Sequence, residues 1–165
     1  MTISIRLDSA DETHAWGARL GAALQAGDVL VLTGGLGAGK TTLTQGIAEG
    51  LGVRGPITSP TFVIARIHPS LVGGPALVHV DAYRLGGPDE LDDLDLDADI
   101  AVSVTVVEWG AGMAEALAAE HLEIVLQPDA GGAARTATLV PTGDRFEALA
   151  AELSHTARRS SGLRE

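Results

Sequence analysis

Short apolar runs alternate along this chain with longer stretches in which apolar residues recur at helical spacing. Residues 29–32 (Val-Leu-Val-Leu) form a continuous apolar run between Asp28 and Thr33, which is typical of a strand buried on both faces. Behind Ser9, apolar residues recur every three or four positions from Trp16 onward, which predicts an amphipathic helix. The same criteria predict strands at 3–5, 62–67, 77–80, 102–107, 122–126 and 136–140, and helices at about 41–50 and around Phe146, Leu149 and Leu153.

Local signals mark where these elements begin and turn. Residues 9–12 (Ser-Ala-Asp-Glu) have the Ser-x-x-Glu form of a capping box, which starts a helix. Glycine pairs at 73–74 and 131–132 are turn signals between strand-like segments. Strands that alternate with helices predict an α/β sandwich around a mostly parallel central sheet, with antiparallel additions at the two turns. We expect one domain over residues 1–156 and a disordered tail over residues 157–165.

Composition narrows the class of protein. The chain has 165 residues, of which 45% are hydrophobic and 20% charged, and these values fit one soluble globular domain. It has no cysteine, which excludes disulfides, thiolate catalysis and cysteine-ligated metal sites. No apolar run approaches the ~18–20 residues that span a bilayer. The first six residues lack both the basic start and the apolar stretch of a signal peptide, so we expect a cytoplasmic protein with no membrane association.

The charge balance bears on possible partners. The formal net charge is −11, because 22 acidic residues outnumber 11 basic ones. A free-standing nucleic-acid binder presents a basic surface, so any role with nucleic acid would require a local patch or a partner that binds it. Lys40 is the only lysine in the chain, since the other basic residues are arginines, and its position is therefore informative.

This lysine lies in a glycine-rich loop between a predicted strand and a predicted helix. Residues 34–41 (Gly-Gly-Leu-Gly-Ala-Gly-Lys-Thr) match the phosphate-binding pattern G-x-x-x-x-G-K-[ST]. Glycines allow backbone N–H groups to converge on an anion, and the helix beginning near Thr41 directs its positive end to the same place. Lys40 adds a cation for the β- and γ-phosphates, and the Thr41 hydroxyl can coordinate Mg²⁺. The pattern predicts a P-loop NTPase-like fold.

Carboxylates at strand ends are the expected partners of the metal. Asp81 ends the predicted strand 77–80, and Glu108 ends the predicted strand 102–107. Ligands of such sheets bind at the carboxyl ends of the strands, so both residues are candidates, and the sequence leaves open which of them binds Mg²⁺ directly. His79 is expected to pack or hydrogen-bond beside Asp81. The seven acids of residues 89–99 lack the spacing of a calcium loop and are interpreted as a solvated acidic face.

A phosphate loop alone leaves several nucleotide-dependent functions open. A Ras-type guanine reader needs a second lysine, which this chain lacks. A small-molecule kinase remains an alternative, although only three widely spaced arginines lie in the middle of the chain and a lid over an acceptor normally carries several. A nucleotide-binding module without turnover also remains open. The interpretation favoured by the residues is a small ATPase or nucleotide switch that serves another protein.

Three further motifs follow the loop in order. They are residues 58–62 (Thr-Ser-Pro-Thr-Phe), 79–85 (His-Val-Asp-Ala-Tyr-Arg-Leu) and 107–110 (Val-Glu-Trp-Gly). Together with residues 37–42 (Gly-Ala-Gly-Lys-Thr-Thr) they resemble the TsaE (YjeE) family, the ATPase component of bacterial tRNA threonylcarbamoyladenosine synthesis. The resemblance runs from about Thr13 to Arg135. The chain departs from the family's usual pattern at Gly35, at residues 110–111 and in its heavier acidic run.

The resemblance implies a role for each matching residue. Lys40, Asp81 and Glu108 match catalytic positions, and Thr41, Glu108 and Asp81 match positions around Mg²⁺. Residues 59–61 match a switch-like element near the γ-phosphate. The residues implied to bind ATP or ADP are Gly37, Ala38, Gly39, Lys40, Thr41, Thr42, Thr61, Trp109 and Arg135.

The resemblance also implies partners. Members of the family associate with the TsaB–TsaD heterodimer, in which TsaD transfers the threonylcarbamoyl group to an adenosine beside the tRNA anticodon. ATP hydrolysis by the TsaE component is thought to reset that complex. This chain would then meet tRNA only indirectly, through the complex, which agrees with its negative charge.

Overall fold

The computed structural model describes residues 2–35, 37–57, 65–81, 97–108, 118–130, 132 and 134–161, except for the side chains of residues 97, 98 and 156–161. The described strands join into one seven-stranded sheet. The strands are β1 (Ile3–Leu7), β2 (Val29–Thr33), β3 (Ala65–His68), β4 (Ala76–Asp81), β5 (Ser103–Glu108), β6 (His121–Pro128) and β7 (Arg135–Thr142). The helices are α1 (Ala10–Ala23), α2 (Lys40–Leu51), α4 (Asp97–Val102) and α6 (Asp144–Ser161).

The sheet is mixed, with a parallel centre. Its strand order is β1-β7-β6-β2-β5-β4-β3. Strand β2 lies between β6 and β5 and is parallel to both, and β4 is parallel to β5. The antiparallel pairs are β3 with β4, β6 with β7, and β1 with β7. The predicted α/β class, the parallel core and the antiparallel additions are therefore confirmed.

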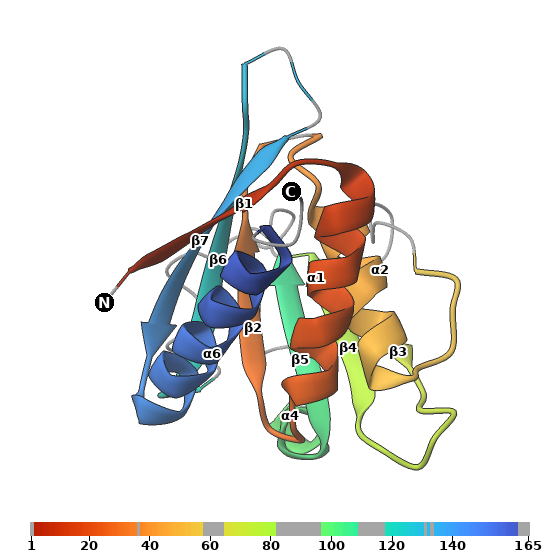
Figure 1. The fold of residues 1–165 in the computed structure, drawn as a ribbon. Helices are drawn as coiled ribbons and strands as arrows, with labels where there is room; N and C mark the ends of the chain where they lie inside the picture. Colours follow the sequence, from red (N-terminus) through yellow and green to blue (C-terminus); the bar gives the residue numbers. More distant parts are fainter. Residues whose placement is uncertain are drawn as a thin grey trace.

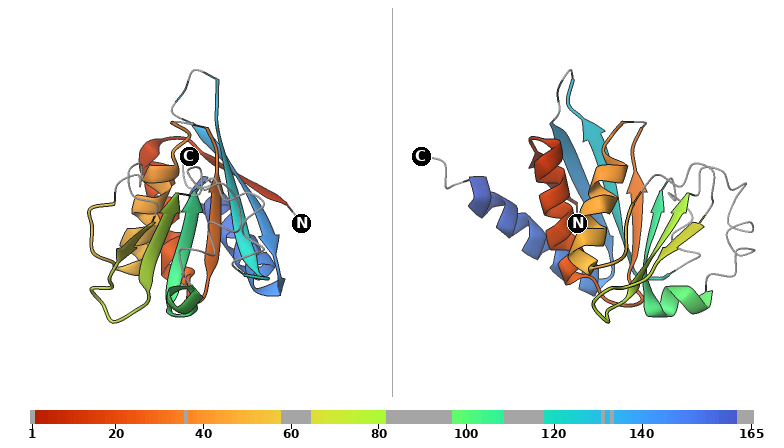
Figure 2. Two further views of the ribbon diagram at one scale, coloured as in Figure 1. Left: turned by 180° about the vertical axis from the view of Figure 1, so that it is seen from behind. Right: turned by 90° about the vertical axis from the view of Figure 1, so that its right-hand side faces the viewer.

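Helices α1, α2 and α6 lie together on one face of this sheet (Figures 1 and 2), and α4 lies at the end where β5 begins. Alternate strand residues point at these helices, because side chains alternate between the faces of a strand. Leu30 and Leu32 of β2 therefore join the same core as Trp16 and Leu20 of α1, and all four are fully buried. Among the described residues, no helix is long and apolar enough to cross a membrane.

Helices α1 and α2 approach each other so closely that only glycine fits at the contact. A Cβ atom on Gly21 would lie 2.2 Å from the carbonyl oxygen of Ile47, and one on Gly46 would lie 2.2 Å from that of His14. A Cβ atom on Gly50 would meet the carbonyl oxygen of Ala18 at 2.1 Å. Backbone therefore packs against backbone along this pair of helices.

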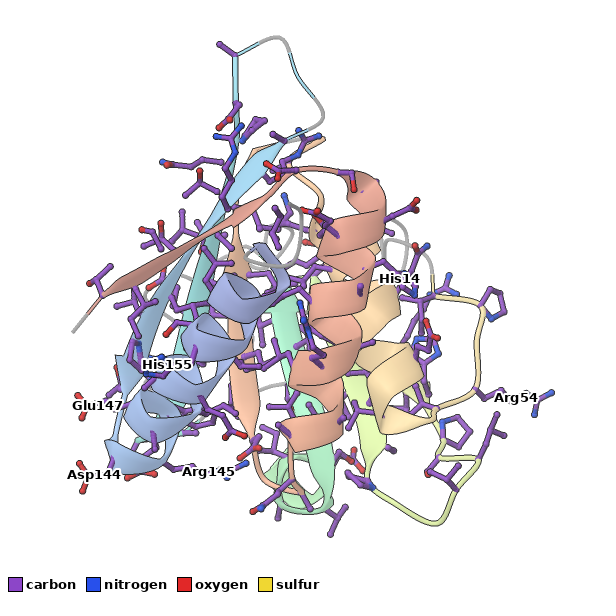
Figure 3. All side chains as sticks on the ribbon, in the orientation of Figure 1. His14, Arg54, Asp144, Arg145, Glu147 and His155 are labelled. Atoms are coloured by element: carbon purple, nitrogen blue, oxygen red, sulfur yellow. The ribbon has the colours of Figure 1, made fainter. Side chains whose placement is uncertain are left out.

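Arg145 ties the first turn of α6 to the start of β2, toward which it reaches in Figure 3. Its Nε donates to Asp28 Oδ1 at 3.0 Å and its Nη2 to Asp28 Oδ2 at 2.5 Å. Asp28 Oδ2 also accepts from the backbone N–H of Gln25 at 2.7 Å. This paired geometry raises the pKa of Arg145, chiefly through the hydrogen bond to Asp28, and it fixes the turn through which the chain enters β2.

Several element boundaries differ from those that the sequence predicts. The Ser9 side chain caps α1 as expected by accepting from the N–H of Glu12, but Glu12 returns the bond to the N–H of Asp8 instead of to that of Ser9. Helix α4 was not predicted, and Val102 ends this helix rather than starting β5. Helix α6 continues to Ser161, and residues 162–165 of the expected tail lie outside the described residues. Residues 62–64, where β3 was expected to begin, and residues 89–96 of the acidic run lie outside the described residues.

The glycine contact between the helices predicts that a Gly-to-Ala substitution within a helix lowers the free energy of unfolding instead of raising it. Within a helix, alanine is ordinarily more stable than glycine by about 1 kcal/mol. Gly21→Ala should instead lower the free energy of unfolding by about 1–3 kcal/mol, because its Cβ would overlap α2. Chemical denaturation measures this change. Gly74→Ala is the control, since its Cβ would meet only Ser70 Oγ at 3.8 Å, and an equal loss in both variants would contradict the contact.

Candidate nucleotide-binding site

The glycine-rich loop leaves the carboxyl end of β2 and enters α2. Gly37 and Gly39 adopt positive φ values of 76° and 102°, a conformation that residues with a Cβ rarely adopt. Ala38 lies between them and is 1% exposed. The sequence of glycines is therefore what allows the chain to turn from strand to helix within so few residues.

The first turn of α2 is open to an anion. Its N-cap is Gly39, which makes no side-chain capping hydrogen bond to the first N–H groups, whereas Ser9 does so for α1. The first turn of α2 also contains no acidic residue. The first N–H groups of a helix lack partners within the helix, and the positive end of its dipole lies there. The loop and α2 together present the donors and the potential that bind phosphate.

Lys40, the first residue of α2, is folded against the loop that precedes it. Its Nζ donates to the carbonyl oxygens of Gly34 at 2.6 Å and Gly35 at 3.1 Å, and the residue is 8% exposed. Burial lowers the pKa of Lys40, while the negative charges of Glu108 and Asp81 act in the opposite direction. The ammonium group therefore lies in the field of both predicted acids.

Asp81 and Glu108 end neighbouring strands at the same edge of the sheet. They are register partners in the parallel pair of β4 and β5, and Glu108 is also the register partner of Leu32 in β2. Asp81 lies four residues after Leu77 and Glu108 two after Val106, so both face the helix side, where Leu77 and Val106 join the core. The two residues are 8% and 3% exposed. The structure thus brings Lys40, Asp81 and Glu108 together, as the sequence predicts.

His79 supports Glu108, whereas the sequence predicts only that His79 packs or hydrogen-bonds beside Asp81. The Nε2 atom of His79 lies 3.1 Å from Glu108 Oε2 in a hydrogen bond, and the histidine is fully buried. Its Nδ1 has no hydrogen-bond partner among the described residues. The sequence signal was present, because His79 and Asp81 share a face of β4, but only the register of β4 against β5 shows that Glu108 is in reach.

The donor set fits magnesium. Thr41 supplies a hydroxyl in the first turn of α2, and Asp81 and Glu108 supply carboxylates at the adjoining strand ends. No group of three or more His, Cys, Asp or Glu side chains in the described part of the chain is arranged to hold a metal ion. Mg²⁺ differs from metals that need such a cage, because it is commonly held by one or two carboxylates, water and the phosphates of the nucleotide.

The remaining predicted residues divide into two groups. Arg135, at the start of β7, contacts the loop: its Nε donates to the Ala38 carbonyl oxygen and its Nη2 to that of Gly37, both at 3.0 Å. Thr42 follows Thr41 in the first turn of α2. Thr61 and Trp109 lie outside the described residues, as does the switch-like segment 59–61.

The chain is similar to proteins of one family. A family model described as "Threonylcarbamoyl adenosine biosynthesis protein TsaE" matches residues 7–137. A protein of Streptomyces coelicolor named tRNA threonylcarbamoyladenosine biosynthesis protein TsaE is 57% identical over 134 residues, which cover 79% of this chain and 90% of that protein. The Bacillus subtilis protein of the same name is 43% identical, over 87% of this chain and 89% of that protein. The crystal structure of YdiB from Bacillus subtilis matches with a TM-score of 0.74 and 36% identity, over 94% of this chain and 96% of that one.

Proposed function

Because this chain belongs to the TsaE family of tRNA threonylcarbamoyladenosine biosynthesis proteins, we propose that it binds and hydrolyses ATP with Mg²⁺. Hydrolysis would support a TsaB–TsaD complex as it threonylcarbamoylates the tRNA adenosine next to the anticodon. One observation carries the ATPase part of the proposal. The phosphate loop, its lysine and two buried carboxylates converge at one edge of the sheet.

In this proposal the loop and α2 bind the phosphates. The first N–H groups of α2 donate hydrogen bonds to phosphate oxygens, and no carboxylate in the first helical turn competes with the nucleotide. Lys40 exchanges the Gly34 and Gly35 carbonyl oxygens for phosphate oxygens, which are stronger acceptors because they are charged. The ammonium then stabilises the charge that spreads over the phosphoryl oxygens in the transition state.

Thr41, Asp81 and Glu108 would hold Mg²⁺ and the attacking water. When bound, Mg²⁺ neutralises the negative charge on the phosphate oxygens. Glu108 is fixed by His79 and is 3% exposed, which suits a carboxylate on the metal side. Asp81 lies beside it on β4 and is the proposed acceptor that orients water for in-line attack.

The proposed partners account for the charge of the chain. With a formal net charge of −11, the protein is repelled by the tRNA backbone at long range. We therefore propose that TsaB and TsaD supply the tRNA-binding surface and that this chain contacts them rather than the tRNA, in the cytoplasm. Its contribution to the modification is then nucleotide-dependent and not part of the transfer chemistry.

Removal of the lysine tests the phosphate loop. Lys40→Ala should lower the rate of ATP hydrolysis at least about a hundredfold, because the positive charge that stabilises the phosphoryl oxygens in the transition state is lost. The fold should persist, which circular dichroism and thermal denaturation measure. Arg54→Ala is the control, since Arg54 is exposed and points away from the helices in Figure 3. An unchanged hydrolysis rate in folded Lys40→Ala would remove the assignment.

Removal of Asp81 and removal of Glu108 should affect Mg²⁺ binding and turnover to different degrees. Asp81→Ala and Glu108→Ala should each slow Mg²⁺-dependent hydrolysis at least about tenfold, or roughly 1.4 kcal/mol of barrier. Glu108→Ala should weaken Mg²⁺ binding more, and Asp81→Ala should reduce turnover more than binding. Titration of hydrolysis with Mg²⁺ separates the two effects. Glu147→Ala on the exposed face of α6 is the control, and normal turnover by Asp81→Ala would leave Asp81 without a catalytic role.

Nucleotide state should also change the affinity for partners. Thr61 is proposed to sense the γ-phosphate, in the manner of NTPase loops that are ordered by ATP and released on hydrolysis. Affinity for TsaB–TsaD should therefore differ several-fold between ATP-like and ADP states, a coupling of about 1–3 kcal/mol. Calorimetry with a non-hydrolysable ATP analogue, with ADP and without nucleotide measures this difference, and Thr61→Ala should shrink it more than it weakens nucleotide binding. Equal affinity in all three states would exclude the switch while leaving the ATPase assignment intact.

A further inference from the structure

Arg135 makes an unusually complete set of hydrogen bonds to backbone carbonyls. Its Nε donates to Ala38 and its Nη2 to Gly37, both in the phosphate loop and both at 3.0 Å. Its Nη1 donates to Gly132 and Ala134, both in the β6–β7 connection and both at 3.1 Å. One guanidinium thus joins two segments that lie almost a hundred residues apart in the sequence.

The two contacts to the loop determine where its N–H groups point. In a trans peptide the carbonyl oxygen and the following N–H point in opposite directions within one plane. The bond to the Ala38 carbonyl therefore turns the Gly39 N–H away from Arg135. The bond to the Gly37 carbonyl fixes the preceding peptide group, whose Ala38 N–H closes a turn onto the Gly35 carbonyl oxygen at 3.1 Å. The guanidinium therefore fixes the orientation of two consecutive peptide groups.

The loop needs such an external restraint. Gly37 and Gly39 have positive φ values, and glycine loses more conformational freedom on folding than any other residue. Lys40 holds the carbonyls of Gly34 and Gly35 at the other end of the loop, but in the proposed function Lys40 leaves them when phosphate binds. Arg135 differs from Lys40 because two of its four carbonyl partners lie outside the loop, in the β6–β7 connection, so it ties the loop to another part of the fold.

Arg135 is itself held in place by strand pairing on both sides of β7. Arg135 is the register partner of Pro128 in β6 and of Leu7 in β1, and the N–H of Asp129 donates to the Ala134 carbonyl oxygen at 2.9 Å. The β6–β7 connection and the loop therefore form one hydrogen-bonded unit through Arg135.

We propose that Arg135 is a positioning residue that holds the phosphate loop in its anion-binding conformation before the nucleotide arrives, by clamping the Gly37 and Ala38 carbonyls to the β6–β7 connection. The proposal rests on nucleotide binding by this loop as proposed above. It differs from a direct contact between Arg135 and the nucleotide, because it requires an effect of Arg135 on the nucleotide-free protein.

Hydrogen exchange of the nucleotide-free protein tests this role without any activity. In Arg135→Ala the amides of Ala38 and Leu43, which donate to the Gly35 and Gly39 carbonyl oxygens, should exchange at least about tenfold faster than in the wild type, because the loop opens locally more often. Arg135→Lys should behave similarly, since lysine keeps the charge but lacks the planar fork that reaches two carbonyls. Arg6→Ala is the matched control: Arg6 pairs with Asp129 of the same connection at 2.8 Å and is not among the partners of the loop. Thermal denaturation verifies that each variant is folded.

Binding of Mg²⁺–ADP and steady-state hydrolysis of ATP complete the experiment. Arg135→Ala should weaken Mg²⁺–ADP binding and raise KM at least about tenfold, because ordering of the loop is then paid at binding, with little change in kcat at saturating ATP. Unchanged loop exchange in Arg135→Ala would overturn the proposal. A fall in kcat beside that unchanged exchange would assign Arg135 a direct contact with the nucleotide instead. If the wild-type protein binds no nucleotide, the proposed function fails, and the exchange result still decides the role of Arg135.

Discussion

The close contact between α1 and α2 is the constraint on which the rest of the site depends. Gly21 and Gly46 allow the two backbones to touch, so α2 is held by packing along its length as well as by its own hydrogen bonds. Lys40 is the first residue of α2, and the position of its ammonium is therefore set by the packing of the whole helix. Close-packed interiors deform little, which makes a packed helix a precise support for a charged group.

The parallel register supplies the other half of the site. Asp81 and Glu108 are separated by 27 positions in the sequence, yet β4 and β5 place them side by side, and Leu32 places Glu108 beside the strand that feeds the loop. Antiparallel pairing of these strands would have put the two carboxylates at opposite ends of the sheet. The topology thus converts two strand-end acids into one carboxylate pair facing Lys40.

The elements and residues that the sequence could predict are those with local signals. The apolar run 29–32, the loop 34–41 and the strand-end acids Asp81 and Glu108 are each visible within a few residues, and each lies where the pattern predicts. Non-local contacts have no such signal. The hydrogen bond of His79 to Glu108 depends on strand register, and the bonds of Arg135 to the loop join the two ends of the domain. Helix α4 was missed because its six residues are too few for a hydrophobic period to show.

Two cations hold the carbonyls of the phosphate loop, and their chemistry differs in a way that suits different tasks. Lysine carries a compact charge on a flexible stem and can move from the Gly34 and Gly35 carbonyls to a phosphate. Arginine presents a rigid planar fork, and that of Arg135 spans two loop carbonyls and two carbonyls of the β6–β7 connection. In a chain with ten arginines and one lysine, the lysine occupies the position that requires movement, and an arginine occupies the position that requires a fixed geometry. An Arg-for-Lys exchange at residue 40 would place a second fork, and not a mobile charge, over the site where the phosphates are proposed to bind.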